Sequence, residues 1–324
     1  ELEKILCAKA REGVEVKIIF DDFGNIKRFS GETIDRLREV GVEVFIFNPV
    51  HEYVNRLHFN YRDHRKIACI DGDVAYTGGV NIADEYANII ERFGYWKDSG
   101  VCLEGEGAWG LTASFIRMCV NLGGVMHNEH DYYRPHTPVK SEGFCQPFTD
   151  GPQNNPDNPA EDVFLQMISG ARRFLYITTP YFIPDESLMR ALCIAGDGGV
   201  DVRLMLPGKP DHWYADCVAE SYFGELLKHG VKVYRYTPGF LHGKSIMVDR
   251  EAAFVGSANM DYRSFELDYE CGVMVYSAPM IESLLEDMDM IVDHSRLVTK
   301  EEWAKRSVLR RVFEPLLRLF AIWM

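Results

Sequence analysis

The sequence predicts an α/β protein built from two copies of one unit, each a mixed β-sheet flanked by helices. Two observations support this fold class. Helix and strand patterns alternate along the chain, and the same order of elements occurs twice. The chain has 324 residues, 47% of them hydrophobic, which is enough for two medium domains with a sizeable core.

Each copy opens with an amphipathic helix, a glycine break and an apolar run typical of a buried strand. A second helix and a second short strand follow. The corresponding ranges are 1–22, 32–41 and 42–47 in the first copy, and 186–207, 217–230 and 231–236 in the second. A strong strand pattern at 172–184 precedes the second copy only. We therefore expect an open gap in the first sheet, and we expect that an upstream part of the protein is missing from this sequence.

Prolines gather between the two copies, at Pro135, Pro138, Pro147, Pro152, Pro156 and Pro159. This composition is typical of a loop-rich linker. The expected organisation is a first lobe at 1–134, a linker at 135–161, a second lobe at 162–299 and a C-terminal segment at 300–324.

Both copies carry the pattern His-x-Lys-x4-Asp, as HRKIACID in the first and HGKSIMVD in the second. Side chains alternate along a strand, so each histidine shares a face with the lysine two residues later. Burying an unpaired ammonium group is costly, but lysine beside imidazole suits a phosphate: one neutralises the oxyanion, the other is a nucleophile. The aspartates come where a turn begins. The expected catalytic residues are His64, Lys66, Asp71, His242, Lys244 and Asp249.

The flanks of the two motifs agree as well. Asn81 lies 17 residues after His64, and Asn259 lies 17 residues after His242. Each asparagine follows a turn of small residues. One such sparse motif would be weak evidence, whereas two at equivalent places in a repeat are hard to explain by chance.

These motifs resemble those of the phospholipase D superfamily, whose hallmark is a pair of HKD motifs. The resemblance covers nearly the whole chain and is closest to bacterial cardiolipin synthases. It rests on NYRDHRKIACIDGDVAYTGGVNIADEY (60–86), ITTPYFIPDESL (177–188), LHGKSIMVD (241–249) and GSANMDYRSFELDYE (256–270). It implies two phospholipase D-like lobes that share one active site between them.

The resemblance also implies a mechanism. One histidine attacks the phosphodiester phosphorus and forms a phosphohistidine, while the other protonates the leaving alkoxide and then deprotonates the incoming alcohol. By family analogy we expect His64 to be the nucleophile and His242 the general acid/base, although the reverse assignment stays open. No metal ion or other cofactor is expected, because two lysines supply the positive charge.

In this family an acidic residue downstream of each motif orients the histidine. Glu270, 28 residues after His242, fits that role. The matching residue of the first copy is Asp98, but six extra residues intervene, so Glu85 and Glu91 are alternatives.

A longer loop before the first motif carries Arg56 and Arg62, with Arg65 just after it. This basic loop is either simply solvated or helps to hold an anionic lipid headgroup. The expected substrate-binding residues are Asn81, Asn259, Asp98, Glu270 and Arg65.

Composition narrows the partners and the compartment. The formal net charge is −14, so no global basic field attracts nucleic acid. The eight cysteines are dispersed without a C-x-x-C pair, which predicts free thiols in a reducing compartment. No apolar run reaches the roughly 18 residues of a membrane-spanning helix. The resemblance places such helices upstream, and hence the intact protein in the bacterial cell membrane.

The segment 300–324 has apolar residues at helical spacing: Leu309, Val312, Phe313, Leu316, Leu317 and Phe320. Six basic and three acidic residues give it a local charge of +3. A basic amphipathic helix of this kind lies in a membrane interface or packs on the protein's own core, and both interpretations stay open. Pro315 predicts a kink in either case.

The resemblance implies a cardiolipin synthase that transfers a phosphatidyl group between two phosphatidylglycerol molecules and releases glycerol. The expected partners are phosphatidylglycerol, other anionic phospholipids and the membrane surface, without nucleic acid. The first alternative keeps the site but uses water or another alcohol as acceptor. A phosphodiester nuclease is disfavoured by the charge, and a noncatalytic lipid-binding protein ranks last because both motifs are intact.

Overall fold

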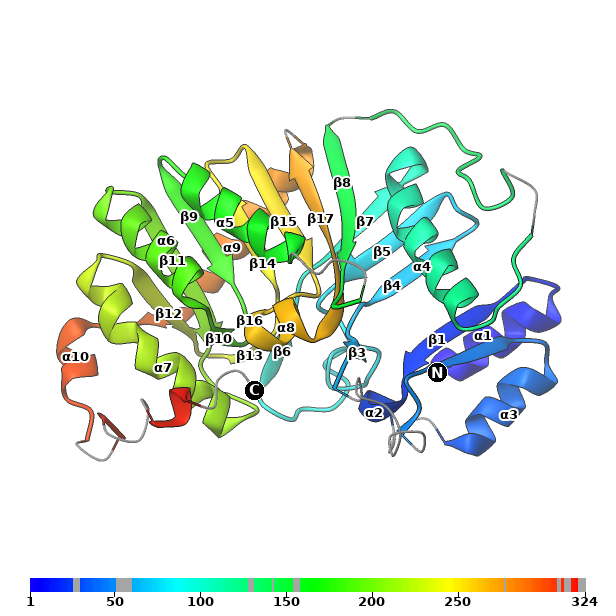
Figure 1. Cartoon of the computed structure of the whole chain (residues 1–324), viewed down its shortest axis with the longest axis horizontal. Helices are drawn as coiled ribbons and strands as arrows, with labels where there is room; N and C mark the ends of the chain where they lie inside the picture. Colours follow the sequence, from blue (N-terminus) through cyan, green and yellow to red (C-terminus); the bar gives the residue numbers. More distant parts are fainter. Residues whose placement is uncertain are drawn as a thin grey trace.

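The computed structural model describes residues 1–25, 30–50, 60–127, 131–141, 143–153, 158–276, 278–307, 310–311 and 316–319. The second half of the chain forms most of one large mixed sheet (Figure 1). In spatial order its strands are β18 (Ser295–Leu297), β12 (Lys232–Tyr236), β11 (Asp201–Pro207), β9 (Phe174–Thr178), β14 (Ser245–Val248), β15 (Ala252–Gly256) and β17 (Asp268–Tyr276). The predicted α/β class is confirmed.

The strand directions follow the connections. β9, β11 and β12 run parallel, and they are joined by the helices α6 (Glu186–Asp197) and α7 (Trp213–Lys228). A parallel pair needs such a crossover. β14 is antiparallel to β9 and to β15, and β15 is antiparallel to β17. The antiparallel pairing of β14 with β9 sets the second motif beside the parallel strands.

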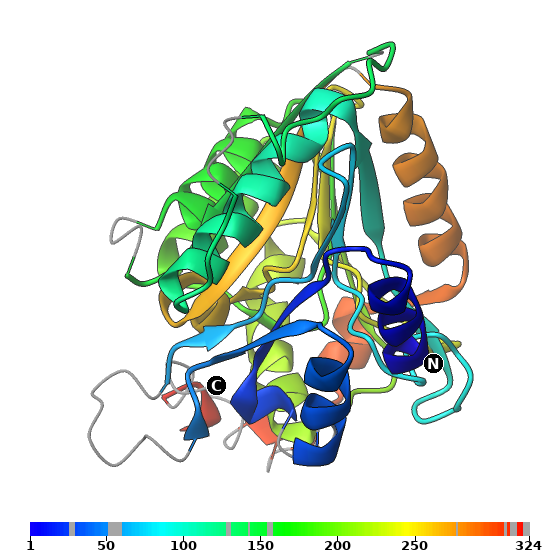
Figure 2. The same ribbon diagram turned by 90° about the vertical axis from the view of Figure 1, so that its right-hand side faces the viewer.

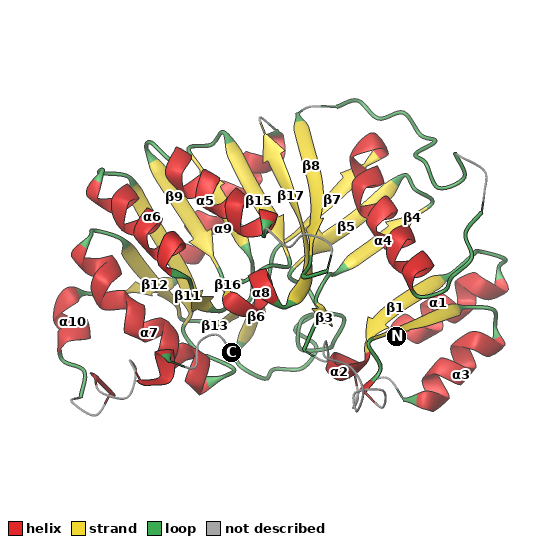
Figure 3. Cartoon of the chain, viewed as in Figure 1, coloured by secondary structure: helices red, strands yellow, loops and turns green. Residues whose placement is uncertain are grey.

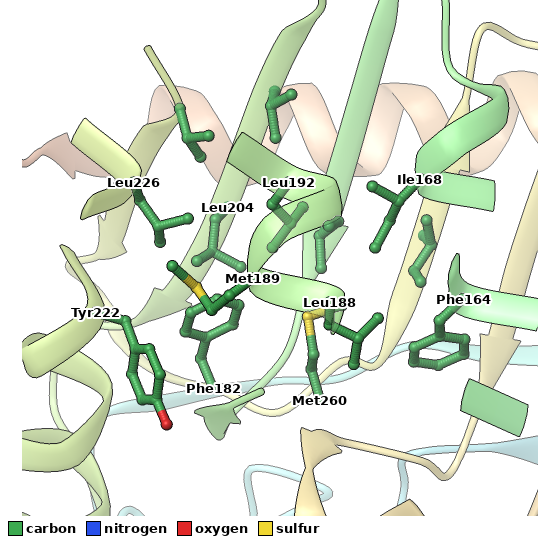
Figure 4. Close-up of a cluster of buried hydrophobic side chains, with 14 of the residues drawn as sticks. Phe164, Ile168, Phe182, Leu188, Met189, Leu192, Leu204, Tyr222, Leu226 and Met260 are labelled. Carbon is green, nitrogen blue, oxygen red and sulfur yellow. The ribbon is translucent and has the colours of Figure 1, made fainter. Parts of the chain in front are cut away.

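Helices cover both faces of this sheet, with α5 (Pro159–Gly170), α6 and α7 on one side and α9 (Pro279–Asp293) on the other (Figure 2). On the first side, the apolar spacing of α6 turns Leu188 and Leu192 towards Leu204 of β11 (Figure 4). On the second side, α9 packs Ile291 against a cluster that includes Met247 of β14. Each fully buried side chain of this kind contributes about 1.5–3 kcal/mol of burial free energy.

The first half of the chain builds two smaller sheets (Figure 3). One pairs β1 (Lys17–Asp21) with β2 (Glu43–Phe47) in parallel, beside α1 (Leu2–Arg11) and α3 (Gly31–Glu39). The other is antiparallel. It contains β4 (Ile67–Ile70), β5 (Val74–Gly78) and β7 (Gly100–Glu104), with α4 (Trp109–Asn121) after it. Two short helices complete this half: α2 (Asp22–Asn25) and η2 (Gly105–Ala108).

The expected gap in the first sheet is present. In the second half, β9 lies between β11 and β14 and pairs with both. By the repeat, β1 and β4 are the counterparts of β11 and β14. They belong to separate sheets, and no described strand lies between them.

The segment 135–161 differs from the loop-rich linker that its prolines predict. Residues Phe144–Asp150 form the strand β8, which pairs along seven positions with β17. Pro147 is tolerated there because β8 pairs with β17 alone among the described strands, so the missing N–H falls on the outer edge. Among the six prolines, Pro156 lies outside the described residues.

Short strands tie the two halves together. From the first half, β3 (Arg62–Asp63) pairs with β17, and β6 (Tyr95–Lys97) pairs with β13 (Gly239–Leu241). In the second half, β10 (Phe182–Ile183) pairs with β16 (Met260–Asp261), which leads into α8 (Tyr262–Glu266). The halves therefore interlock at the ends of their strands, where both motifs lie.

The C-terminal segment is described in part, beginning with α10 (Lys300–Ala304). Trp303 and Leu317 pack against the core beside α7, whereas Leu319 is 73% exposed. Leu309, Val312, Phe313, Pro315 and Phe320 lie outside the described residues, so both interpretations of this helix stay open. None of the described helices is long and apolar enough to span a bilayer. The eight cysteines are free thiols, as predicted.

Candidate active site

The two motif histidines lie where the halves interlock. His64 follows β3, and its backbone N–H donates a hydrogen bond to the Tyr269 carbonyl of β17 at 3.0 Å. His242 follows β13, and its backbone N–H donates to the Lys97 carbonyl of β6 at 2.7 Å. Each motif is therefore anchored to a strand of the other half.

A carboxylate binds each imidazole, and it also comes from the other half. Glu270 Oε1 lies 2.8 Å from Nδ1 of His64, and Asp98 Oδ2 lies 2.8 Å from Nδ1 of His242. A carboxylate only accepts, so both Nδ1 atoms carry the proton and leave Nε2 with its lone pair. We expected an acidic residue downstream of each motif, and the structure brings both to the histidines. The pairing differs from that expectation because it crosses between the halves.

The alternatives to Asp98 lie elsewhere. Glu85 forms an ion pair with Arg92 at 3.4 Å, and Glu91 is exposed. Sequence separation alone could not choose among the three acidic residues, because the inserted residues form the loop that carries Tyr86.

Two lysines bring positive charge into the site. Lys244 is 1% exposed, and its Nζ lies 2.7 Å from the His242 carbonyl oxygen and 2.9 Å from both ring nitrogens of His242. Lys66 Nζ donates to the His64 carbonyl at 2.5 Å. Burial lowers the pKa of Lys244 to about 7, with repulsion from Lys66 added to it and attraction to Asp98 opposing it. One buried and one half-buried ammonium group favour an anionic ligand between them.

The histidines rest in the neutral form. Burial, together with the charge of Lys244, lowers the pKa of His242 to about 4 against the attraction of Asp98. Burial also lowers the pKa of His64, and Lys66 adds to this effect while Glu270 opposes it. Each histidine is also influenced by the lysine of the other motif. The two motifs therefore form one electrostatic site.

The second oxygens of the carboxylates are held differently in the two halves. Glu270 Oε2 accepts a hydrogen bond from Ser257 Oγ, and the pKa of Glu270 stays low because His64, Lys66 and this hydroxyl outweigh its burial. In the first half Gly79 replaces that serine, and a Cβ there would lie 2.2 Å from Asp98 Oδ1. The oxygen accepts instead from the backbone N–H of Ser99 at 2.8 Å.

The two motif asparagines lie near the site in different settings. Asn81 Nδ2 donates to the Tyr86 hydroxyl at 2.6 Å, and the Tyr86 ring stands edge-on to the His242 ring, with centroids 5.2 Å apart. Asn259 is buried, and its Oδ1 has no partner among the described residues. A donor from a substrate would satisfy that oxygen.

The motif aspartates serve turns, which corrects their expected catalytic role. Asp249 has φ 54°, and its carboxylate accepts three backbone N–H bonds, from Arg172, Arg173 and Phe174, each at 2.8 Å. It thereby holds the start of β9. Asp71 has the same φ of 54° but is exposed at the surface. The contacts of Asp249 go to backbone and not to either histidine.

The expected role of Arg65 in substrate binding is also corrected, because its side chain points away from the face that carries the histidines. Its guanidinium binds both carboxylate oxygens of Asp63, at 2.8 and 2.9 Å, and Ser114 of α4 at 3.2 Å. Arg62 is buried and directed towards Asp21 at 3.5 Å. Both are committed to structural pairs, so neither is available to hold a headgroup, and Arg56 lies outside the described residues.

One cluster has the composition of a metal site. A ring nitrogen of His64 and one oxygen each of Asp268 and Glu270 lie within 4.8 Å of one another. The Nδ1–H of His64 already donates a hydrogen bond to Glu270, and Lys66 and Arg263 supply positive charge to the two carboxyl groups. This donor set therefore fits a protonated network better than a cation.

Sequence reasoning missed the residues two positions before each carboxylate. Trp96 precedes Asp98 and packs against His242, with ring centroids 5.7 Å apart. Asp268 precedes Glu270 and reaches the His64 cluster. The signal was present, since side chains two apart on a strand share a face.

The family and its relatives fit this geometry. The family described as "Cardiolipin synthase, PLD-like domain" matches residues 1–89 and 164–292. The chain is 38% identical to a "Cardiolipin synthase" of Halalkalibacterium halodurans and 38% identical to the "Major cardiolipin synthase ClsA" of Bacillus subtilis. Each alignment covers 99% of this chain but only 64% and 66% of the respective relative. This chain thus spans slightly less than two thirds of the length of each of these relatives.

Among solved structures, the phosphatidylserine synthase of Haemophilus influenzae aligns with a TM-score of 0.66 at 15% identity. The alignment covers 99% of this chain and 90% of that one, which supports the fold alone. The crossed histidine–carboxylate pairs, the two motif lysines and these relatives agree: the chain belongs to the cardiolipin synthase family with phospholipase D-like domains.

Proposed function

We propose that this protein is the phosphatidyltransferase part of a cardiolipin synthase, acting on phosphatidylglycerol at a membrane surface. The observation that carries the proposal is the pair of neutral histidines, each held by a carboxylate of the other half and accompanied by the lysine of its motif. The relatives named above supply the substrate class. The reaction joins two phosphatidylglycerol molecules into cardiolipin and releases glycerol.

His64 is the better nucleophile. Its side chain is 29% exposed, against 7% for His242, and no described residue hydrogen-bonds its Nε2. Nε2 attacks the phosphorus as the bond to the glycerol oxygen breaks, and the ring becomes a phosphorylated imidazolium. Glu270, which accepts a hydrogen bond from the Nδ1–H of His64, stabilises the positive charge that develops on the ring.

His242 is the general acid and base. The anionic phosphodiester between Lys66 and Lys244 favours its protonated form, against the burial that otherwise keeps it neutral. Nε2 of His242 gives its proton to the leaving glycerol alkoxide. It then takes a proton from the hydroxyl of the second phosphatidylglycerol, which attacks the phosphohistidine and frees His64.

The test is incubation of full-length protein with phosphatidylglycerol vesicles, followed by lipid mass spectrometry. We expect cardiolipin and glycerol in equal amounts, and activity that persists in EDTA. Phosphatidic acid as the main product would instead indicate a hydrolase with water as acceptor. Activity lost in EDTA and restored by one divalent metal would contradict the mechanism.

A further inference from the structure

A buried carboxyl group near His64 has no part in the mechanism above. Asp268 begins β17 and is 6% exposed. Its Oδ2 lies 3.2 Å from Nε of Arg263, which belongs to α8. Its Oδ1 is buried and lacks a hydrogen-bond partner among the described residues. A charged oxygen in that position would be costly, because it has lost water and gained no donor.

The surroundings of Asp268 already hold an ionised carboxyl group. One oxygen of Asp268 lies within 4.8 Å of one oxygen of Glu270 and of a ring nitrogen of His64. Two carboxylates this close do not both ionise readily. Of the two, Glu270 is the carboxyl group that ionises more easily, because His64 and Ser257 both donate hydrogen bonds to it.

Charged groups on every neighbouring element act on Asp268. Burial raises its pKa well above the usual range, Arg263 opposes this, and Glu270 and Asp261 add to it, while Lys66 opposes it. In the parallel pairing of β3 with β17, Arg62 stands in register with Asp268. The Arg62 guanidinium is directed to Asp21 and to the Asn48 carbonyl, at 3.5 and 3.2 Å.

Among the described residues, no such pair of carboxyl groups gathers at the other histidine. The position equivalent to Asp268 is Trp96, two residues before Asp98. With Phe240, Trp96 forms an aromatic wall beside His242. Of these two equivalent positions, the one with a carboxyl group is on the His64 side, where the phosphohistidine would form.

We propose that Asp268 rests as a neutral carboxylic acid, and that its neutrality lets the His64 side accept an anionic phosphodiester. Glu270 is then the one ionised carboxyl group paired with His64 in this cluster. Ionisation of Asp268 at high pH would place a second negative charge beside the incoming phosphate. Asp268 acts here only through its charge state and makes no contact with substrate, and its effect on catalysis rests on the proposed function.

The decisive variant is Asp268→Asn, which keeps the shape of the side chain and fixes its neutral form. Near pH 7 we expect kcat and KM for phosphatidylglycerol vesicles to stay within about threefold of wild type, because the charge state is unchanged. As pH rises through the ionisation of Asp268, the KM of the wild type should rise relative to that of the variant. Glu270→Gln is the matched control, and it should lose activity at every pH because it removes the required anion.

Two readouts need no substrate, so they test Asp268 even if the proposed function fails. The first is the infrared carbonyl band of a protonated carboxylic acid, which wild-type protein at pH 7 should show and the variant should lack. The second is thermal stability. A raised folded pKa means that ionisation opposes folding, so wild-type stability falls as pH rises above the unfolded value of 3.8. The variant should not show this decrease. Its thermal unfolding midpoint should therefore rise relative to that of wild type as pH rises.

Three results would overturn the inference. An Asp268→Asn enzyme as impaired at pH 7 as Glu270→Gln would mean that the carboxylate is ionised and required. If wild type and Asp268→Asn showed no difference in the protonated-carboxyl band at pH 7, Asp268 would be ionised at that pH. Binding of Mn²⁺ or Mg²⁺ by wild type but not by the variant would make the cluster a metal site. A wild-type enzyme that forms no cardiolipin would refute the proposed function and leave the spectroscopic result standing.

Discussion

In the second half of the chain β9 joins β11 to β14, whereas in the first half the equivalent strands β1 and β4 belong to separate sheets. The two halves nevertheless hold their motif histidines in the same way, with a carboxylate on Nδ1 and a lysine two residues later. What the two halves share at the histidines is the exchange of short strands and carboxylates between them.

The surroundings of the histidines differ more than their partners do. Tyr86, Trp96 and Phe240 surround His242, while Asp268 and Ser257 lie by the His64–Glu270 pair. A duplicated motif has thus acquired two environments. Under the mechanism that we propose, the enclosed environment suits His242 as acid and base, and the more exposed one suits His64 as nucleophile.

The largest effect expected comes from removing either histidine. His64→Ala and His242→Ala should each lower cardiolipin formation by about 1,000-fold or more, because a nucleophile and a proton carrier are both required. The double variant should be little worse than either single one. The measurement is cardiolipin output from phosphatidylglycerol vesicles.

His229→Ala is the matched control, since His229 pairs with Asp197 on the surface of the second half and should keep full activity. Acid-labile phosphate trapped on wild type and on His242→Ala, but not on His64→Ala, would assign the nucleophile. Phosphate trapped on His242 would exchange the two roles.

The crossed pairing predicts which residues act as units. Glu270→Gln and Asp98→Asn should each cost about 100-fold or more in kcat, because the imidazole loses its orienting anion. In double-mutant cycles we expect strong coupling between His64 and Glu270 and between His242 and Asp98. Stronger coupling of His64 to Asp98 would contradict the crossing.

A smaller effect is expected at the position where the first half has Gly79 and the second half has Ser257. Gly79→Ala places a Cβ 2.2 Å from Asp98 Oδ1, so the carboxylate must move from His242. We expect a loss of kcat of about 10–100-fold, since a displacement of about 1 Å in a catalytic group has this cost. Ser257→Ala removes only one hydrogen bond to Glu270 and should cost less. Equal losses would mean that the halves tolerate this exchange alike.

Sequence reasoning predicted the α/β class, the repeat, the gap in the first sheet and the residues that meet at the site. These follow from periodicity and spacing, which are local. The crossing of Glu270 and Asp98 was not predictable, because it depends on how the halves dock. Arg65 and Asp249 were misjudged for the same reason: their partners, Asp63 and the backbone at 172–174, become visible only in three dimensions.

The smallest effect expected concerns the two motif aspartates, and it bears on the separation of β1 from β4 in the first half. Asp249 and Asp71 share φ 54°, and asparagine tolerates that conformation, so Asp→Asn isolates the carboxylate at each position. Asp249 accepts three backbone N–H bonds at the start of β9, whereas no such strand is described beside Asp71. We expect Asp249→Asn to lower the free energy of unfolding by about 1–3 kcal/mol and Asp71→Asn by less than about 0.5 kcal/mol.

The pH dependence checks the cause of that difference. Burial tends to raise the pKa of Asp249, but the three N–H donors outweigh it and hold the pKa below its usual value. A lowered folded pKa gives stability that is present above the unfolded value of 3.8 and is lost as pH falls through the folded pKa. The gap between wild type and Asp249→Asn in chemical denaturation should therefore be full at pH 6 and shrink below pH 4. A gap of the same size for Asp71→Asn would mean that Asp71 also holds a strand, and that the two sheets of the first half are joined in solution.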